Sequence, residues 1–376
     1  MNLSILEYQD EYFAIYITVL ISFILLFLTF YLVISALAYR FINNRKMAYY
    51  ELKRKECLPK ILEFVFDRDD LDASMVESGV RTKADYQPVL SLLYELLDDI
   101  EGDESERIRL ILGITVFRAY HQKLLSSRNK DNRIAACKYY SHIIDLTDKE
   151  YERLEKMLGD SSVLVIHSAA SAIMSSPNVI RRIHALAAVS RRKSISRLAI
   201  LELLNEYHHT DKDQMDEEAE QLLHLIKADH IQTDHLAIII KGICDIGYVS
   251  IIDELYLLIE NGFADDRELV LEALIYTIGR FQYGIVVDQI LQKYQDDRRP
   301  RIRRACAEML ESLVDPLYGP NLLKLAMDQE FSVRIKSVYA LAALGPEGTE
   351  YLKVLQKESP ENRLMIQSIV SEVTQN

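Results

Sequence analysis

The longest apolar segment of the chain runs from Tyr12 to Tyr39 and contains no charged residue, histidine, amide, proline or glycine. An α-helix rises about 1.5 Å per residue, and the hydrocarbon core of a bilayer is about 30 Å thick, so a run of this length is long enough to cross a membrane with some tilt. The pattern therefore predicts one transmembrane helix over residues 12–39, preceded by a short non-cytoplasmic segment, residues 1–11.

The flanks of this run predict a retained anchor and its orientation. The preceding residues Glu7, Asp10 and Glu11 are acidic, the run is longer than the core of a signal peptide, and no small-residue cleavage site follows. Cations gather directly after the run, whereas the first eleven residues contain no Lys or Arg. The positive-inside rule then places the N-terminus outside and the C-terminal part in the cytoplasm, with the anchor in the cytoplasmic (inner) membrane. We expect a basic collar on the membrane surface, formed by Arg40, Arg45, Lys46, Lys53, Arg54 and Lys55.

Residues 40–80 form the expected connection between anchor and body. The helical pattern continues over 40–66, and an acidic stretch from Asp67 to Asp72, followed by Gly79, interrupts it. Such an interruption is typical of a hinge. Residues 81–130 are expected to form a helical cap at the start of the body.

A repeated helical pattern follows over residues 131–376. Equivalent anchor positions recur every 29 to 39 residues, and the positions 3, 6, 7 and 10 after each anchor are almost all apolar. Apolar residues at this spacing share one face of a helix, and a period of this length is typical of stacked helical hairpins. The anchors are Arg133, Ile166, Arg197, Leu236, Glu268, Arg303, Arg334 and Arg363.

The segment from Asp328 to Gly345, DQEFSVRIKSVYALAALG, resembles the second helix of a HEAT repeat. The resemblance implies an all-α fold, an α-solenoid of HEAT-like or armadillo-type hairpins behind a single transmembrane helix. In HEAT repeats an Asp caps the second helix and an Arg near its start reaches the neighbouring repeat. The resemblance therefore assigns Asp297, Arg303, Asp328 and Arg334 to an inter-repeat ladder, which the anchors without Arg interrupt in the middle of the array.

Charge and composition narrow the classes of partner. The net charge is −13, of which the first eleven residues carry −3 and residues 39–60 carry +5, so residues 61–376 carry −15. A body of that sign repels phosphate backbones, and we expect no nucleic-acid partner. The four cysteines are scattered without a C-x-x-C pair, which suits a reducing compartment and a role as small apolar filling.

The usual catalytic motifs are missing from the sequence. It contains no G-x-G-x-x-G, no P-loop, no G-x-S-x-G and no H-E-x-x-H. Helical-repeat hydroxylases of the deoxyhypusine type bind iron through His-Glu pairs, and the chain has no His-Glu dipeptide. We therefore expect no catalytic residue and no cofactor. A lyase-like helical-repeat enzyme, similar to the phycobilin lyases, stays as a less favoured alternative.

One segment has the composition of a metal site. His208, His209, Asp211, Asp213 and Asp216 carry the imidazole and carboxylate ligands that Zn²⁺ or Ca²⁺ would need. The spacing does not fit a calcium loop, because Asp216 stands where Gly is required. We expect a solvated acidic loop and no metal.

Two arginine-rich clusters interrupt the acidic background. The better candidate for a partner-binding patch consists of Arg181, Arg182, Arg191, Arg192, Lys193 and Arg197, and a second cluster spans residues 298–304. Exposed, the first cluster would bind an acidic peptide or a phosphate. The alternative is that these arginines pair with acidic residues of adjacent repeats.

These patterns favour a non-enzymatic scaffold over two other classes. A single anchor with a large helical body suits an adaptor that binds a cytoplasmic or membrane protein at the bilayer, and a role as accessory subunit of a membrane complex is a narrower version of the same expectation. The main alternative is a sensory module that binds a phosphorylated small molecule through the arginine cluster. The lyase-like enzyme is the third class.

Overall fold

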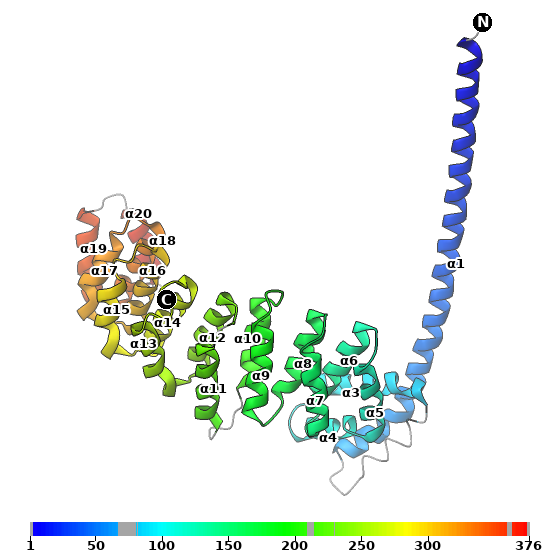
Figure 1. Cartoon of the computed structure of the whole chain (residues 1–376), viewed down its shortest axis with the longest axis horizontal. Helices are drawn as coiled ribbons and strands as arrows, with labels where there is room; N and C mark the ends of the chain where they lie inside the picture. The colour runs from blue at the N-terminus through cyan, green and yellow to red at the C-terminus, as the bar shows by residue number, and fades with distance from the viewer. Residues whose placement is uncertain are drawn as a thin grey trace. The chain divides into compact units, whose positions relative to one another are not determined.

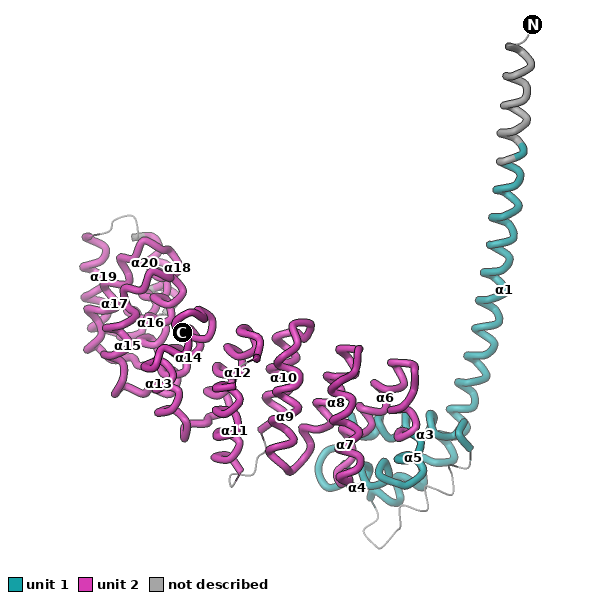
Figure 2. The backbone as a smooth tube through the Cα atoms, in the orientation of Figure 1, with its two compact units in different colours: residues 1–120 teal, residues 121–376 magenta. Residues whose placement is uncertain are grey.

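The fold is all-α throughout the part of the chain that the structure describes. The structure, a computed structural model, describes residues 3–66, 80, 82–208, 214–228, 230–358 and 363–373. These residues form helices and contain no strand, as the sequence predicts. The expected hinge over residues 67–79 lies outside the described residues. By its internal contacts the chain divides into two compact units, residues 1–120 and 121–376 (Figure 2).

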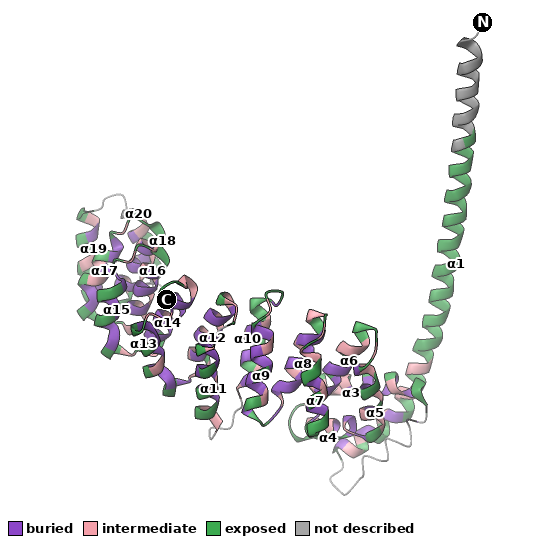
Figure 3. Ribbon diagram, in the orientation of Figure 1, coloured by how far each residue is buried: buried purple, intermediate pink, exposed green. Residues whose placement is uncertain are grey.

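A single helix dominates the first unit. Helix α1 (Leu3–Phe66) runs unbroken for 64 residues, which corresponds to about 96 Å. Every described side chain from Thr18 to Ala48 is exposed, as the uniform colour of this part of α1 in Figure 3 shows. The window of highest hydropathy in this helix is entirely unburied. The structure thus contains one long apolar helix near the N-terminus.

The last third of α1 packs against the rest of the first unit. Tyr49, Lys53, Cys57, Ile61 and Val65 follow one another at intervals of four residues, and the last three are buried. Residues at this spacing form one ridge of a helix, and here the ridge lies against its neighbours. The neighbours are α3 (Lys83–Asp99) and α4 (Asp103–Leu112), with α5 (Thr115–Leu125) following along the chain.

The second unit consists of helices that alternate between two rows (Figure 1). Helices of the second row pack on one another in chain order. This row contains α6 (Lys130–Tyr140), α8 (Val163–Met174), α10 (Arg197–Tyr207), α12 (Thr233–Ile246), α14 (Glu268–Arg280), α16 (Pro300–Leu313), α18 (Phe331–Ala343) and α20 (Arg363–Val373). The first row contains α7 (Asp148–Met157), α9 (Val179–Ser190), α11 (Met215–Lys227), α13 (Ile252–Glu260), α15 (Val287–Tyr294), α17 (Gly319–Ala326) and α19 (Pro346–Glu358).

The core of the second unit follows the apolar frame expected from the sequence. Of the positions 3, 6, 7 and 10 after each anchor, those whose burial is described are all buried, except Ile246 and Leu313, which are half-buried. The frame succeeds because it follows the helical period, which is a local property of the sequence. Burial between the two rows supplies the main driving force for their packing.

Glycine and proline mark several helix ends in the second unit. Gly247 and Gly345 end α12 and α18 with φ of 93° and 68°, a left-handed conformation that glycine adopts without strain. Pro346 is the first residue of α19. Gly279 is the second-last residue of α14. A Cβ at Gly279 would lie 2.6 Å from the Cα of Met309, so this glycine permits close contact between α14 and α16.

Candidate functional site

The six residues of the predicted arginine patch lie at two different ends of α9. Asn178 begins this helix, because its side chain accepts hydrogen bonds from the backbone N–H groups of Ile180 and Arg181. Arg181 and Arg182 therefore fall in the first turn. The remaining four, Arg191, Arg192, Lys193 and Arg197, lie beyond the other end of the helix, in the α9–α10 loop and at the start of α10.

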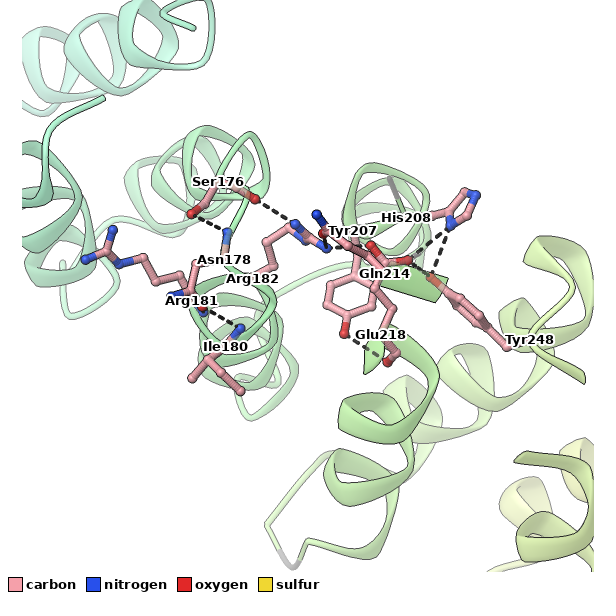
Figure 4. A network of polar contacts seen from close by, with 10 residues as sticks. All are labelled: Ser176, Asn178, Ile180, Arg181, Arg182, Tyr207, His208, Gln214, Glu218 and Tyr248. Carbon is pink, nitrogen blue, oxygen red and sulfur yellow. Dashed lines mark hydrogen bonds and ion pairs between the residues drawn. The ribbon is translucent and has the colours of Figure 1, made fainter. Parts of the chain in front are cut away.

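Arg182 is fully buried, and Figure 4 shows the polar contacts around it. Its guanidinium donates to Glu218 Oε1 at 2.5 Å and to the carbonyl oxygen of Ser176 at 2.7 Å. Glu218, on α11, is also completely buried. The second oxygen of that carboxylate accepts from the hydroxyl of Tyr248 at 2.7 Å and lies 3.2 Å from Nδ1 of His208. The network joins the first-row helices α9 and α11 to the start of the next helix pair.

Burial removes Arg182 from any exposed patch, which corrects the expectation from the sequence. Arg181 is partly exposed but also paired, because its guanidinium donates to Asp148 at 2.8 Å and lies over the ring of Tyr151. For these two residues the structure shows the alternative that the sequence left open, pairing with acidic residues of a neighbouring helix pair. Sequence spacing alone did not separate them from the arginines at the other end of α9.

Three arginines of the second row, Arg133, Arg303 and Arg334, make the same kind of backbone contact as Arg182. In each case the guanidinium donates to the carbonyl oxygen six positions earlier in the chain, in the loop before its own helix. Two of the second-row arginines also form two hydrogen bonds to an Asp of the next helix pair. Arg133 contacts Asp160 at 2.7 and 3.0 Å, and Arg303 contacts Asp328 at 2.5 and 2.7 Å.

The remaining residues assigned to the ladder make other contacts. The carboxylate of Asp297 accepts from Arg299 at 2.8 and 2.9 Å, and Asp297 offers Arg303 its backbone carbonyl only. Arg334 likewise contacts the backbone carbonyl of Asp328 at 2.9 Å. These bonds fix the loops that lead from α15 into α16 and from α17 into α18.

A row of tyrosines forms a second set of contacts that the sequence analysis missed. Tyr248 donates to Glu218 and Tyr283 donates to Asp253, each 30 positions earlier. Burial raises the pKa of Tyr318, the charges of Asp288 and Asp315 raise it further, and a hydrogen bond to Asp288 adds to the effect. The three tyrosines are spaced by 35 residues, and so are the three acids. That shared period was the signal available in the sequence.

The α9–α10 loop is held from both sides. The buried ring of His235, on α12, lies 2.9 Å from the carbonyl oxygen of Ser190 and 3.1 Å from that of Ile195. Gln232 donates to the carbonyl oxygens of Ser190 and Arg191, through its backbone and its side chain respectively. On the other side, Arg192 donates to the carbonyl oxygen of Leu158 at 3.1 Å.

This loop presents the exposed part of the predicted patch. Arg191, Lys193 and Arg197 are exposed, and Arg192 is half-buried. The side chain of Arg197 is 64% exposed and lies 3.4 Å from Asp234. Among the residues that the structure describes, no ion pair is recorded for Arg191 or Lys193.

The second arginine cluster is largely paired. Arg299 contacts Asp297, as described above. Arg301 and Arg304 both lie near Glu272 on α14, at 3.6 and 3.2 Å. Lys241 contacts the same carboxylate at 3.2 Å from α12. These cations therefore link successive helices of the second row.

The predicted membrane collar divides into two groups. Lys53 lies 3.2 Å from Asp85, and Arg54 forms two hydrogen bonds of 2.7 Å to Glu95, so both fasten α1 to α3. Burial opposes ionisation of Asp85, but hydrogen bonds from Tyr49, Thr82 and Lys53 outweigh it and hold the pKa of this carboxyl well below its usual range. The exposed group consists of Arg40, Arg45, Lys46 and Lys55.

The candidate metal ligands are only partly described. His209, Asp211 and Asp213 lie outside the described residues, whereas His208 contacts Glu218 in the network of Figure 4. Within the described ranges no group of His, Cys, Asp and Glu is arranged to hold a metal ion. The cysteines are free thiols, and burial raises the pKa of Cys137 to about 12 and that of Cys306 to about 12.

Comparison with known proteins leaves the geometry as the basis for assigning a function. No protein-family model matches the chain, and no curated protein matches it. Most of the polar groups described above join one helix pair to the next. The α9–α10 loop differs from them, because its backbone is held on both sides while its cations face solvent.

Proposed function

We propose that this chain is a membrane-anchored scaffold whose cytoplasmic α-solenoid of HEAT-like repeats binds a protein partner at the bilayer. The observation that carries the proposal is the unbroken exposure of the apolar part of α1. Each buried large aliphatic or aromatic side chain contributes about 1.5 to 3 kcal/mol relative to an exposed one, so a soluble protein has a strong reason to cover such a helix. A bilayer covers all of it at once.

The continuity of α1 argues for a retained anchor. The apolar part passes without a break into the ridge from Tyr49 to Val65 that packs on α3 and α4. Cleavage after a signal sequence would cut through this helix next to its packed part. Tyr39 and Tyr49 are ten residues apart, so α1 would hold the packed part of the first unit about 15 Å from the end of the span.

The repeats support the scaffold part of the proposal. Stacked helix pairs, a shared apolar frame and polar contacts that recur at 35-residue intervals are properties of repeat arrays, in which each unit contacts its neighbours. Arrays of this kind offer extended surfaces to proteins, and anchoring raises the effective concentration of a bound partner at the membrane. The alternative is a sensor that binds a phosphorylated small molecule through the arginine cluster. It is weaker because Arg182, the one fully buried cation of that cluster, is already paired with Glu218.

Alkaline carbonate extraction of membranes from expressing cells tests the proposal. We expect the full chain to stay in the membrane pellet and a variant lacking residues 1–40 to become soluble. The helical content of that variant, measured by circular dichroism, controls for misfolding. Release of the full chain by carbonate would contradict the anchor, because a spanning helix is not extracted by high pH.

A further inference from the structure

We propose that the α9–α10 loop, together with Leu164 and Leu198, is the docking surface for an acidic amphipathic segment of a protein partner. The proposal rests on the scaffold function above and specifies the chemistry of the partner. The surface is defined by residues 191–197 and by these two leucines. Its members come from three parts of the chain: the start of α8, the loop, and the start of α10.

The shape of this surface is set before any partner arrives. His235 and Gln232 hold the loop backbone from α12, and Arg192 holds it to the turn before α8. The two ring nitrogens of His235 lie within hydrogen-bonding distance of the carbonyl oxygens of Ser190 and Ile195, and a ring N–H that donates to either of them fastens the loop to α12. A partner that binds here does not have to order the loop, and avoiding that cost favours affinity.

The surface carries exposed cations in a body whose net charge is negative. Arg191, Lys193 and Arg197 are exposed, and the first residues of α8 and α10 add the positive ends of two helices. The contact of Arg197 with Asp234 is long, at 3.4 Å, and both side chains are substantially exposed. Such a pair contributes little to stability, so Arg197 is available to a carboxylate of a partner.

Two exposed leucines add an apolar component. Leu164 is 60% exposed and Leu198 is 73% exposed, and each is the second residue of its helix. Helices α8 and α10 are packed neighbours, and packed helices lie about 8 to 10 Å apart. Two turns of a partner helix span a similar distance, about 10 Å, so apolar residues seven positions apart would meet the two leucines. Acidic residues beside them would meet the cations of the loop.

The rest of the body favours a protein ligand over an anionic membrane. Residues 61–376 carry a net charge of −15, which opposes close approach to anionic headgroups or to nucleic acid. A single protein segment contacts only the basic surface and avoids this repulsion.

A defined peptide tests the proposal with the full chain in non-ionic detergent. The probe is a fluorescent helical peptide with two leucines about seven positions apart, flanked by glutamates, and its control has glutamine at every glutamate. Fluorescence anisotropy should show binding of the acidic peptide that weakens with added salt. Double charge reversal, Arg191→Glu with Lys193→Glu, should weaken it about tenfold, as should Leu198→Ser.

Two matched variants separate this surface from general effects. Arg298→Glu reverses an exposed cation of another loop, and Leu317→Ser changes a leucine that is 71% exposed at another helix start. Both should leave binding unchanged, and all variants should keep the thermal unfolding midpoint because the changed side chains are exposed.

No binding by the unaltered chain, or equal binding by the charge-reversed chain, would overturn the proposal. Preferential binding to phosphatidylserine vesicles, lost on charge reversal, would overturn it in favour of a lipid surface. The peptide-binding measurement contains no bilayer, so its result does not depend on whether α1 spans a membrane.

Discussion

A guanidinium and a carboxylate lie together out of water where α9 meets α11. Arg182 and Glu218 are both completely buried, and Tyr248 and Ser176 satisfy further hydrogen bonds of the pair. Taking two charges out of water costs several kcal/mol for each ion, and mutual attraction offsets that cost only while both are present. The pair therefore makes the junction sensitive to the loss of either partner.

Loss of one partner should destabilise the second unit strongly. We expect Arg182→Met to lower the free energy of unfolding by about 3 to 5 kcal/mol, because Glu218 would stay buried without its cation. Chemical denaturation followed by circular dichroism measures the change. The combined variant Arg182→Met with Glu218→Met should recover much of the loss, since neither charge then remains.

Arg181 provides the matched control for this prediction. It is the preceding residue, but its partner Asp148 is 82% exposed, so Arg181→Met should cost about 1 kcal/mol or less. Equal losses in the free energy of unfolding for the two substitutions would contradict a special contribution of the buried Arg182–Glu218 pair to stability.

The contrast between these two arginines shows the limit of sequence interpretation at the residue scale. Successive side chains of a helix point about 100° apart, so Arg182 faces inward here while Arg181 faces solvent. Which one faces inward depends on the position of Glu218, far along the chain. The cluster was predictable as a set of cations, whereas its division into buried, paired and exposed members was not.

At the scale of elements, helix packing depends on particular small residues. Gly279 lies on the side of α14 that faces α16, and a Cβ there would lie 2.6 Å from the backbone Cα of Met309. Backbone atoms cannot move aside without shifting a helix. The glycine therefore sets the distance between two neighbours of the second row.

Substitution of this glycine should separate the two helices. We expect Gly279→Ala to lower the free energy of unfolding by about 1 to 3 kcal/mol, the range typical of overpacking. Gly284→Ala is the control, because no atom lies within 4 Å of a Cβ built there, and it should be nearly neutral. Urea denaturation of the two variants gives the comparison. A neutral Gly279→Ala would mean that α14 and α16 tolerate a wider spacing.

The elements themselves were largely predictable, and their cross-links were not. The apolar frame found the second-row helices because helical periodicity is local. The contacts of Tyr248 and Tyr283 were not predicted, because each tyrosine resembles an ordinary core aromatic residue. Only a comparison of the 35-residue spacing of the tyrosines with the equal spacing of the acids reveals them. The packing role of Gly279 was not predictable either, because its contact with Met309 depends on a helix 30 residues further along the chain.

At the scale of the whole molecule, the two units have different kinds of surface. The second unit buries its apolar residues between two rows of helices, whereas α1 leaves its apolar residues from Thr18 to Ala48 uncovered. Lys53 and Arg54, expected to lie on the membrane, instead fasten α1 to α3, and the exposed cations Arg40, Arg45 and Lys46 lie between this fastening and the span. The proposed anchor thus ends in a short basic segment that leads directly into packed structure.

Cysteine labelling on the two sides of the apolar run in α1 tests the membrane anchor most directly. Variants Ser4→Cys and Asn43→Cys are treated in intact cells with a maleimide that cannot cross membranes, then again after permeabilisation. The native cysteines are a small background, since three are buried and Cys244 is half-buried. The proposed topology predicts that position 4 reacts in intact cells and that position 43 reacts only after permeabilisation. Reaction of both positions from the same side would contradict a spanning helix, and with it the scaffold at the membrane.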